Sequence, residues 1–421
     1  MQTRSYGDFS AGIHGRLLQE RVALEATIEV TRRCPLVCAH CYNNLPMDDR
    51  EARRGELSYE EHCRILDEIA DAGCLWLLYS GGEIFARRDF LDIYTYAKTK
   101  GLLITLFTNA TMITPRIADY LLEWPPFSIE VTLYGRTKQT YERLTGVPGS
   151  YEKCLAGIGL LKERGLPVKL KSVAVSINKH EVWDMQRFAE QELGLEFKFD
   201  AMMTPRIDCS QSPLDVRLKA WEVVDFDLQE PRRVREWKRF AERFNGPLHS
   251  PGEGAEIYHC GGGVNGFAID PEGKMSICVL SHFDTYDLRK GSFREGWEGF
   301  LLKVRSKKAT LATKCVKCEI KALCGMCPAN GELENGHAEK PVEFLCHVAH
   351  LRANVLDIKV PAHGQCDYCE GGARHDELMR SADALRRRDA SRLISYEGEK
   401  RSLPIMAPGG GCSTGGCSSC G

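Results

Sequence analysis

The chain has 421 residues, and its 56 Lys and Arg nearly balance its 58 Asp and Glu to give a formal charge of −2. This length allows roughly two to three domains with a large core, and the small charge gives no electrostatic reason to expect nucleic acid or a membrane surface as a partner. No apolar run reaches the roughly 18 residues of a membrane-spanning helix, and no signal peptide is recognisable. We therefore expect the chain in a reducing cytoplasm, where its 19 cysteines predict metal ligation rather than disulfides.

Residues 1–24 are too few for a folded module and are expected to form an extended arm or a small hairpin. From residue 26 onward, short apolar strands alternate six times with amphipathic helices. The expected strands are residues 26–30, 74–79, 103–108, 128–133, 168–175 and 195–199. Strands separated by such helices pair in parallel, so residues 25–225 predict an α/β fold, a partial (β/α)6 barrel of the TIM type. The site of such a barrel lies at the carboxyl ends of its strands.

Several helix boundaries are legible in this region. Ser58 and Glu61 predict a capping box at the start of one helix. Thr114 followed by Pro115 predicts the N-cap and the first position of another. The alternation then stops, and residues 226–258 are expected to form a charged bridging helix and a Gly- and Pro-rich linker.

The first expected strand leads into the loop TRRCPLVCAHCYN, which places Cys34, Cys38 and Cys41 within eight residues. The spacing C-x3-C-x2-C offers three thiols, whereas a structural zinc site closes a tetrahedron with four ligands. Three thiolates on one loop suit three irons of a cubic [4Fe–4S] cluster and leave the fourth iron without a protein ligand. A small molecule can bind at that iron, so the loop is predicted to be a catalytic cluster site.

Polar or glycine-rich residues follow the other strands of the expected barrel. They are Gly81, Gly82 and Glu83 after the second strand, Asn109 after the third, Thr132 and Tyr134 at the end of the fourth, and Asn178 beyond the fifth. Glycines permit close approach of the backbone, and a buried carboxylate is complementary to a cation. Because the carboxyl ends of parallel strands meet at one edge, this succession predicts a single site there.

The C-terminal half carries a second group of cysteines. Residues 266–278, GFAIDPEGKMSIC, predict a hairpin that turns at residues 271–273. The cysteines of this region are Cys260, Cys278, Cys315, Cys318, Cys324, Cys327 and Cys346. Paired C-x2-C spacing also occurs in zinc knuckles, so zinc stays an alternative for residues 315–327.

The cysteine loop, with His40 directly before its last cysteine, resembles the C-x3-C-x-Φ-C signature of the radical S-adenosylmethionine (SAM) enzymes. In that family the open iron chelates the amino and carboxylate groups of SAM. The reduced cluster then splits SAM into methionine and a 5′-deoxyadenosyl radical, which abstracts hydrogen from the substrate. The resemblance therefore implies a catalytic role for Cys34, Cys38 and Cys41, with SAM and a [4Fe–4S] cluster as cofactors.

The resemblance also implies residues that bind SAM. The sequence Gly81-Gly82-Glu83 resembles the GGE motif of the family, which receives the SAM ammonium group, and Asn109 lies in a TNA segment that resembles the family's TNG, with Ala in place of Gly. Relatives contact the SAM ribose or the substrate at the positions of Thr132 and Tyr134, and adenosine near Asn178. With His40, the implied SAM-binding residues are His40, Gly81, Gly82, Glu83, Asn109, Thr132, Tyr134 and Asn178.

The seven later cysteines resemble the SPASM domain, which binds auxiliary clusters in radical SAM peptide maturases; here it would span residues 259–360. Their spacing fits that pattern, except that Cys327 arrives one residue early. The resemblance implies one auxiliary [4Fe–4S] cluster on Cys315, Cys318, Cys324 and Cys346, and a second on Cys260, Cys278 and Cys327. The second lacks one ligand, because the position that some relatives use is Gly266 here. An open iron that could take a substrate thiolate is favoured over completion by His259 or by a tail cysteine.

Residues 361–421 lie beyond the family pattern and are expected to be partly disordered. They contain Cys366-x2-Cys369, a charged helical stretch over residues 375–391, and the ending GGGCSTGGCSSCG with Cys412, Cys417 and Cys420. So glycine-rich an ending is not expected to fold alone. Five alternatives stay open: a metal clip that pairs two C-x2-C units, a ligand for the incomplete cluster, a flexible thiol carrier, a tethered substrate-like peptide, and a disordered tail.

The whole resemblance implies a radical SAM/SPASM oxidoreductase that oxidises or crosslinks a ribosomally made peptide or protein. The first 24 residues leave no room for a leader-binding domain, so a separate leader-binding protein is a candidate partner, beside a flavodoxin- or ferredoxin-type electron donor. Two alternatives stay open. One is radical SAM chemistry on a small molecule such as a tetrapyrrole, and the other is a zinc-binding interaction protein without catalysis.

Overall fold

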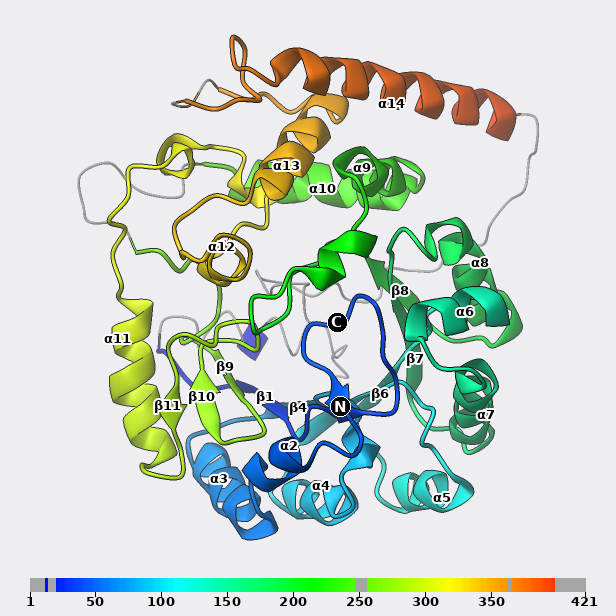
Figure 1. The fold of residues 1–421 in the computed structure, drawn as a ribbon, viewed down its shortest axis with the longest axis vertical. Helices are drawn as coiled ribbons and strands as arrows, with labels where there is room; N and C mark the ends of the chain where they lie inside the picture. The colour runs from blue at the N-terminus through cyan, green and yellow to red at the C-terminus, as the bar shows by residue number, and fades with distance from the viewer. Residues whose placement is uncertain (1–11, 14–19, 247–255, 362, 364, 398–421) are drawn as a thin grey trace, which may run out of the picture. The chain divides into compact units, whose positions relative to one another are not determined.

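The computed structural model describes residues 12–13, 20–246, 256–361, 363 and 365–397 (Figure 1). The predicted N-terminal arm lies largely outside these residues. The tail cysteines Cys412, Cys417 and Cys420 lie wholly outside them, as does most of the predicted linker.

The chain divides into two compact units. The barrel unit comprises the described residues of Ser10–Arg217 and Cys260–Ser306, and the helical unit comprises those of Leu218–His259 and Lys307–Ser413. Residues 260–306, which we predicted as part of the second domain, therefore belong to the barrel unit. Each unit is described by itself below.

Six parallel strands form the centre of the barrel unit. They are β1 (Glu25–Glu29), β4 (Trp76–Ser80), β5 (Leu103–Thr108), β6 (Ser128–Thr132), β7 (Val168–Val173) and β8 (Phe197–Asp200). These strands neighbour one another in chain order, and each pair is parallel. The predicted partial (β/α)6 barrel is therefore confirmed, with each strand within a few residues of its predicted place.

Helices cover the outer face of these strands (Figure 1). They are α3 (Tyr59–Asp71), α4 (Phe90–Thr99), α5 (Pro115–Glu123), α6 (Lys138–Thr145), α7 (Ser150–Glu163) and α8 (Val182–Arg187). Ile65, Leu66 and Ile69 of α3 are fully buried, as are Ile104 and Leu106 of β5. Burial of such aliphatic side chains contributes about 1.5–3 kcal/mol each to the free energy of unfolding, so the layer between the helices and the sheet forms the core of this unit.

The predicted helix starts are present. Ser58 accepts a hydrogen bond from the backbone N–H of Glu61, and the Glu61 carboxylate accepts one from the backbone N–H of Ser58 at 2.7 Å. Thr114 caps α5 by accepting a hydrogen bond from the backbone N–H of Ile117 at 3.3 Å, and Pro115 is the first residue of this helix. Such caps satisfy backbone donors that the helix itself leaves open and typically stabilise by about 1 kcal/mol.

The predicted hairpin extends the barrel sheet beyond β1. Strands β9 (Gly266–Ile269), β10 (Lys274–Ser276) and β11 (Tyr286–Asp287) continue it, with β9 parallel to β1 and β10 antiparallel to β9. The sheet thus has nine strands in the order β11-β10-β9-β1-β4-β5-β6-β7-β8. This unit also contains β2 (Arg33–Cys34), β3 (Leu45–Pro46), α2 (Arg50–Gly55) and α11 (Leu302–Arg305).

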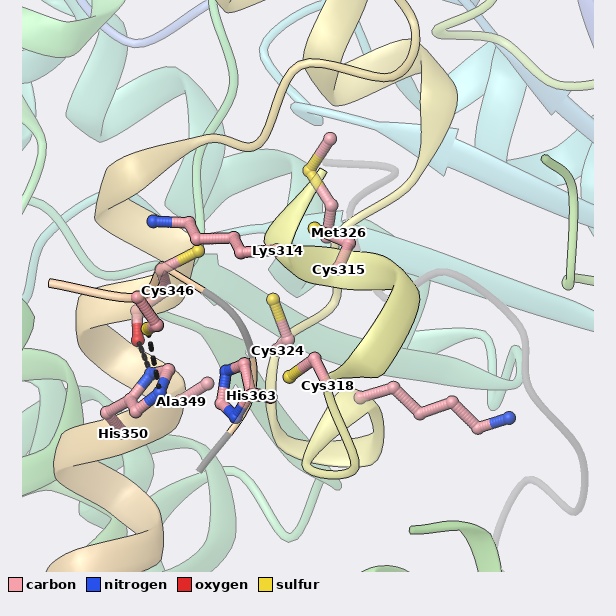
Figure 2. Close-up of a pocket in the computed structure, with 11 residues that line it drawn as sticks. Lys314, Cys315, Cys318, Cys324, Met326, Cys346, Ala349, His350 and His363 are labelled. Carbon is pink, nitrogen blue, oxygen red and sulfur yellow. Dashed lines mark hydrogen bonds between the residues drawn. The ribbon is translucent and has the colours of Figure 1, made fainter. Parts of the chain in front are cut away.

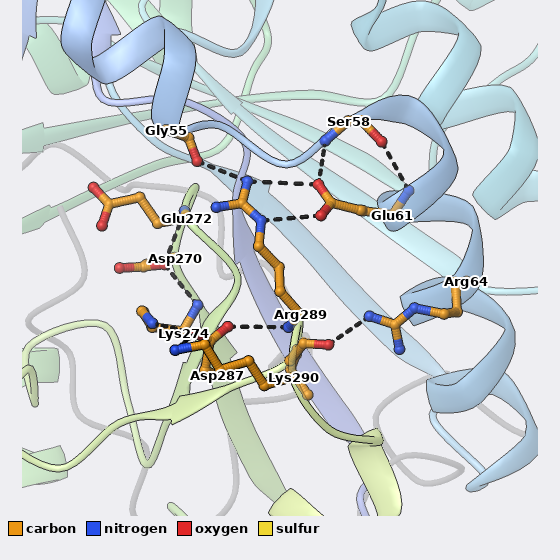
Figure 3. Close-up of polar contacts among 11 residues, drawn as sticks. Gly55, Ser58, Glu61, Arg64, Asp270, Glu272, Lys274, Asp287, Arg289 and Lys290 are labelled. Atoms are coloured by element: carbon orange, nitrogen blue, oxygen red, sulfur yellow. Dashed lines mark hydrogen bonds and ion pairs between the residues drawn. The ribbon is translucent and has the colours of Figure 1, made fainter.

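Side chains also join the hairpin to the first helices of the barrel (Figure 3). Arg289 donates to the Glu61 carboxylate at 3.0 Å and to the carbonyl oxygen of Gly55 at 2.8 Å. Half-exposed ion pairs of this kind contribute only about 0–1 kcal/mol. Within the hairpin region itself, the ring of Phe267 on β9 packs 4.8 Å from that of buried Phe293.

The helical unit contains α9 (Ala220–Leu228), α10 (Pro231–Phe244), α12 (Pro328–Asn335), α13 (Glu343–Val355) and α14 (His375–Glu397). One of its core clusters is small and consists of Ala241, Ile320, Leu323, Ala349 and Ala353. A buried ion pair joins two of the helices, with Arg352 donating to the Asp227 carboxylate at 2.9 Å. No helix in the described part of the chain is long and apolar enough to cross a membrane.

Candidate functional site

The loop that carries Cys34, Cys38 and Cys41 begins directly after β1. Its two ends are joined by a short parallel pairing, in which Arg33 lies opposite Leu45 and Cys34 opposite Pro46. The backbone N–H of Cys41 donates to the carbonyl oxygen of Cys38 at 3.1 Å. The loop therefore closes on itself, and it presents its three thiols from one compact turn.

Buried ionic and polar groups hold the start of the loop. Arg33 forms an ion pair with Glu56 at 2.8 Å, and both side chains are almost completely buried. Thr31 also donates to the Glu56 carboxylate at 2.5 Å. Removing one partner of such a pair leaves an uncompensated buried charge, so this anchor resists displacement of the loop.

The end of the loop is held from the segment after β8. The Arg206 guanidinium donates to the carbonyl oxygen of Cys41 at 3.1 Å and to the side chain of Asn44 at 2.8 Å. The backbone N–H of Ile207 donates to the carbonyl oxygen of Tyr42 at 3.0 Å. We did not predict Arg206 as a site residue, because it lies 165 residues from Cys41 in the sequence.

Burial raises the pKa of all three loop thiols, and the neighbouring thiols raise the pKa values of Cys34 and Cys38 further. Two polar groups oppose this effect. The Asn109 amide donates to Cys34 Sγ at 3.5 Å, and Tyr134 donates to the Cys38 sulfur. Thiolates gathered in this way need a strong positive partner, which the irons of a cluster supply.

The number of donors on the loop favours a cluster over a structural zinc ion, which takes four ligands. Three sulfurs on one loop fit three corners of a [4Fe–4S] cluster. The donor set and its burial thus fit the cofactor that the sequence predicted.

Gly81 and Gly82 lie where β4 meets the cysteine loop. The backbone N–H of Gly82 donates to the carbonyl oxygen of Thr31 at 2.7 Å. A Cβ atom added at Gly81 would lie 2.2 Å from the Thr31 carbonyl oxygen, and one at Gly82 would lie 2.4 Å from the Arg32 carbonyl oxygen. Only glycine permits this approach, so the motif also locks the loop onto the sheet.

Glu83 connects this motif to the segment after β5. Its buried carboxylate accepts a hydrogen bond from the Thr108 hydroxyl at 2.7 Å and one from the backbone N–H of Asn109 at 2.8 Å. Burial nevertheless raises the pKa of Glu83 to about 7. A cation that reached this carboxylate would stabilise its charged form and lower that pKa.

Glu29 is a second buried carboxylate beside the loop, and we did not predict it. Its Oε1 accepts hydrogen bonds from the Tyr42 hydroxyl and, at 2.7 Å, from the Asn43 amide. Its Oε2 is buried and has no hydrogen-bond partner within the described structure. Burial raises the pKa of Glu29 to about 7. An unpaired buried oxygen of this kind is available to a ligand with a donor group.

The other predicted SAM contacts lie near the same edge. The His40 ring packs 5.3 Å from that of Tyr134, and burial lowers the pKa of His40 to about 4, so it acts as a neutral aromatic side chain. Thr132 is buried at the end of β6. Asn178 is fully buried, and its amide bonds the backbone of Val173, Val175 and Tyr134. Direct contact of these residues with SAM stays a prediction.

Four of the predicted auxiliary ligands meet in the helical unit. Cys315, Cys318, Cys324 and Cys346 line one pocket (Figure 2). Burial raises the pKa of Cys315 to about 12, and a hydrogen bond to Cys346 raises that of Cys324. Lys314, whose Nζ lies 2.6 Å from the Glu343 carboxylate, lines the same pocket. Four converging sulfurs beside a cation fit the ligand set of one cluster.

The ligands of the predicted second auxiliary cluster are divided between the units. Cys327 and His259 line a pocket of the helical unit together with Cys315. Cys260 and Cys278 belong to the barrel unit. Gly266, at the position where some relatives supply a cysteine, begins β9 and offers no ligand. This second ligand set stays a prediction.

Residues 28–190 match the model of the Radical SAM superfamily. The chain is 28% identical over 327 residues to an AdoMet-dependent heme synthase of Methanosarcina barkeri, a match that covers 73% of this chain and 92% of that protein. It is 32% identical over 167 residues to a PqqA peptide cyclase of Ruegeria pomeroyi, with 40% and 43% of the two chains covered.

Solved structures show the same fold. Streptococcus suis SuiB bound to S-adenosylmethionine superposes with a TM-score of 0.57 at 16% identity, over 80% of this chain and 82% of that one. The enzyme anSMEcpe with bound AdoMet and the Cp18Cys peptide superposes with a TM-score of 0.55 at 15% identity, over 86% and 99%. At these identities the likeness concerns the fold.

Proposed function

We propose that this chain, of which residues 28–190 match the model of the Radical SAM superfamily, cleaves S-adenosylmethionine reductively and uses the radical to oxidise or crosslink a ribosomally made peptide or protein. The observation that carries the proposal is the loop of Cys34, Cys38 and Cys41, which Gly81 and Gly82 lock at the carboxyl edge of a parallel sheet. A bound [4Fe–4S] cluster supplies the electron for cleavage and an open iron for SAM.

The chain's own residues bind and orient the reactants. The three cysteines hold the cluster, while Asn109 and Tyr134 donate hydrogen bonds to two of their sulfurs and so tune its potential. The Gly81–Glu83 motif would receive the amino group of SAM. The carboxylates of Glu83 and Glu29 would accept hydrogen bonds from its N–H groups.

The helical unit contributes an auxiliary [4Fe–4S] cluster on Cys315, Cys318, Cys324 and Cys346. A second cluster uses Cys260, Cys278 and Cys327, and its fourth position is open to a substrate thiolate or is filled by His259. Clusters held by these cysteines would supply an acceptor for the electron that the substrate radical releases, so that the net reaction would be an oxidation. The electron for SAM comes from a flavodoxin- or ferredoxin-type donor in a reducing cytoplasm.

A peptide substrate is favoured by the fold. The two solved relatives above include an enzyme with a bound peptide, and a further structure holds SuiB with its precursor peptide SuiA. The PqqA peptide cyclases match at up to 32% identity. A separate leader-binding protein would deliver the substrate.

A tetrapyrrole substrate is the second candidate. Three AdoMet-dependent heme synthases match 73–75% of this chain at 25–28% identity, a longer stretch than the cyclase match to Ruegeria pomeroyi.

The first experiment measures iron, acid-labile sulfide and 5′-deoxyadenosine after anaerobic reconstitution and reduction with dithionite in the presence of SAM. The wild-type chain should form 5′-deoxyadenosine, and the Cys34→Ala/Cys38→Ala/Cys41→Ala variant should form none. A wild-type chain that binds zinc but no iron would instead support the alternative of a zinc-binding interaction protein without catalysis.

The second experiment identifies the substrate class. Peptides encoded beside this gene, and iron-containing tetrapyrroles as the competing class, are incubated with the reduced enzyme and SAM and analysed by mass spectrometry. A loss of hydrogen from a peptide, absent with the triple cysteine variant, supports the peptide assignment. Turnover of the tetrapyrrole alone would replace it.

A further inference from the structure

The helical unit contains a second kind of metal-ligating site, formed by His350, His363, Cys366 and Cys369. All four side chains are buried, with exposed fractions of 4%, 2%, 5% and 9%. Their ligand atoms lie within 4.8 Å of one another. His350 lies on α13, and the other three follow within the segment before α14. The contact between His350 and Cys366 was not visible in the sequence.

The spacing of these atoms fits a single tetrahedral ion. Zinc bonds of about 2.3 Å to sulfur and about 2.05 Å to nitrogen place neighbouring ligand atoms about 3.6 Å apart. His350 Nε2 lies 3.4 Å from Cys366 Sγ and 3.8 Å from Cys369 Sγ. Cys369 Sγ lies 3.6 Å from His363 Nδ1 and 4.0 Å from His363 Nε2. The four ligand atoms lie within 4.8 Å of one another, which is close to the spacing around one tetrahedral ion.

The outer hydrogen bonds fix which nitrogen of each ring is left unprotonated and so can bind an ion. A carbonyl oxygen can only accept, so His350 Nδ1 donates to the carbonyl oxygen of Cys346 at 2.8 Å and leaves Nε2 unprotonated. His363 Nδ1 donates in the same way to the carbonyl oxygen of Pro361 at 2.9 Å. Such partners orient the rings of zinc-binding histidines and raise their basicity.

The backbone of the Cys366–Cys369 turn is also built for a ligand pair. The N–H of Cys369 donates to the carbonyl oxygen of Cys366 at 3.2 Å, and the N–H of Gly372 donates to that of Cys369 at 2.8 Å. A Cβ atom at Gly372 would lie 2.4 Å from the carbonyl oxygen of Cys366. The glycine therefore lets the chain fold tightly behind the two sulfurs.

We propose that His350, His363, Cys366 and Cys369 bind one zinc ion in a closed, structural site. The site is independent of the proposed reaction. A [2Fe–2S] centre with two His on one iron and two Cys on the other would separate the nitrogens from the sulfurs. Here His350 Nε2 is close to both sulfurs, at 3.4 Å from Cys366 Sγ and 3.8 Å from Cys369 Sγ.

The zinc site stands beside the four-cysteine pocket, which His350, His363 and Cys366 also line (Figure 2). Cys346 and His350 are one turn apart on α13. The two sites therefore use neighbouring turns of one helix but separate ligand sets. The site also joins this turn to Tyr368, whose ring is buried and stacks on that of His347 at 5.1 Å.

The test measures zinc and iron by mass spectrometry in the full chain, purified anaerobically without added chelator. The wild-type chain should contain about one zinc per chain in addition to its iron. The Cys366→Ala/Cys369→Ala variant should lose the zinc and keep its iron, while Cys63→Ala, outside every ligand set, should keep both. Because alanine could unfold the unit, Cys369→His is made as well, and it should retain zinc.

Two further measurements sharpen the assignment. A chain that ends at residue 397 should keep its zinc, because the tail cysteines are not ligands of this site. Cobalt loaded in place of zinc should give the absorption of a tetrahedral ion with two thiolates. Absence of zinc from the wild-type chain, loss of zinc on removing the tail, or loss of iron in Cys366→Ala/Cys369→Ala would each overturn the proposal.

Discussion

The two cysteine regions of this chain are built in different ways. In the barrel unit, three ligands lie on one loop, and the fold holds that loop through contacts to Gly82, Glu56 and Arg206. In the helical unit, the ligands come from several short turns and from α13. The core cluster against which Cys318 and Cys324 pack contains three alanines and only two larger aliphatic side chains.

This difference implies a different dependence on metal. The loop in the barrel unit is shaped by strand pairing and buried ion pairs, so it can form before a cluster binds. The helical unit draws its predicted ligands from several short turns, so we expect metal binding to supply more of its folding free energy. We therefore expect the barrel loop to be formed before its proposed cluster binds, and the helical unit to depend in part on its proposed metals.

The largest effect is expected for Gly82→Ala, which tests whether the barrel preforms its loop. The added Cβ would lie 2.4 Å from the Arg32 carbonyl oxygen, so the loop must move away from β4. A displacement of about 1 Å in a positioned site can cost roughly 100-fold in rate. SAM cleavage, measured as 5′-deoxyadenosine, should fall by about that factor.

The control for this variant is Gly159→Ala. Gly159 lies within α7, and a Cβ there meets no atom within 4 Å. Alanine favours a helix interior by about 1 kcal/mol over glycine, so this variant should be as stable as the wild type or more so. Equal rates of SAM cleavage in both variants would contradict a preformed loop.

Metal removal tests whether the helical unit depends on its proposed metals more than the barrel unit does. After the iron and zinc are stripped anaerobically, amide hydrogen exchange in α13 should speed up by about 100-fold or more, since its cross-links to the ligand turns are lost. Exchange in β4, β5 and β6 should change by less than about threefold, because their hydrogen bonds lie in a continuous sheet. Equal loss of protection in both units would mean that the barrel also needs its metal.

The barrel could be predicted because its signals are local. Alternation of short apolar segments with capped helices gave all six parallel strands, and the spacing of Cys34, Cys38 and Cys41 indicated the cluster loop. The hairpin was also predicted, but its pairing with β1 was not, because strand order depends on contacts far apart in the sequence.

The missed residues share a physical reason. Glu29 looks like any residue of a short strand, and only the fold shows its burial beside Tyr42 and Asn43. Arg206 acts on a loop 165 residues away. His350 and Cys366 are 16 residues apart, and a helix and an irregular segment bring them together. Such pairings carry no periodic signal.

A smaller effect is expected from the protonation of Glu83, which tests how the barrel site receives a cation. Burial raises the pKa of this carboxyl from 4.5 to about 7, so the folded chain without SAM binds a proton that the unfolded chain releases. The free energy of unfolding therefore falls as the pH rises from about 4.5 to about 7, by at most about 1.4 kcal/mol per pH unit for this group. The SAM ammonium group favours the ionised carboxylate.

SAM should therefore bind more tightly to the cluster-loaded enzyme as the pH rises from 6 to 8, by up to about tenfold for each unit below the pKa. Glu83→Gln keeps the shape and removes the titration, so its affinity should be weaker and should not follow this rise. Isothermal titration at several pH values measures both. An unchanged pH dependence in Glu83→Gln would assign the effect to another group, with Glu29→Gln as the next variant.

The smallest effect is expected for Lys314→Met, which asks how the helical unit tunes the cluster that its cysteines bind. Although burial opposes its charge, the neighbouring Cys346 and Glu343 raise the pKa of Lys314, so it stays protonated beside the ligand set. A positive charge near a cluster favours its reduced form, so its loss should lower the potential of the auxiliary cluster by on the order of tens of millivolts. Lys317→Met removes an exposed charge of the same turn and should shift the potential much less. Redox titration followed by electron paramagnetic resonance distinguishes the two, and equal shifts would show that Lys314 acts only through the net charge of the unit.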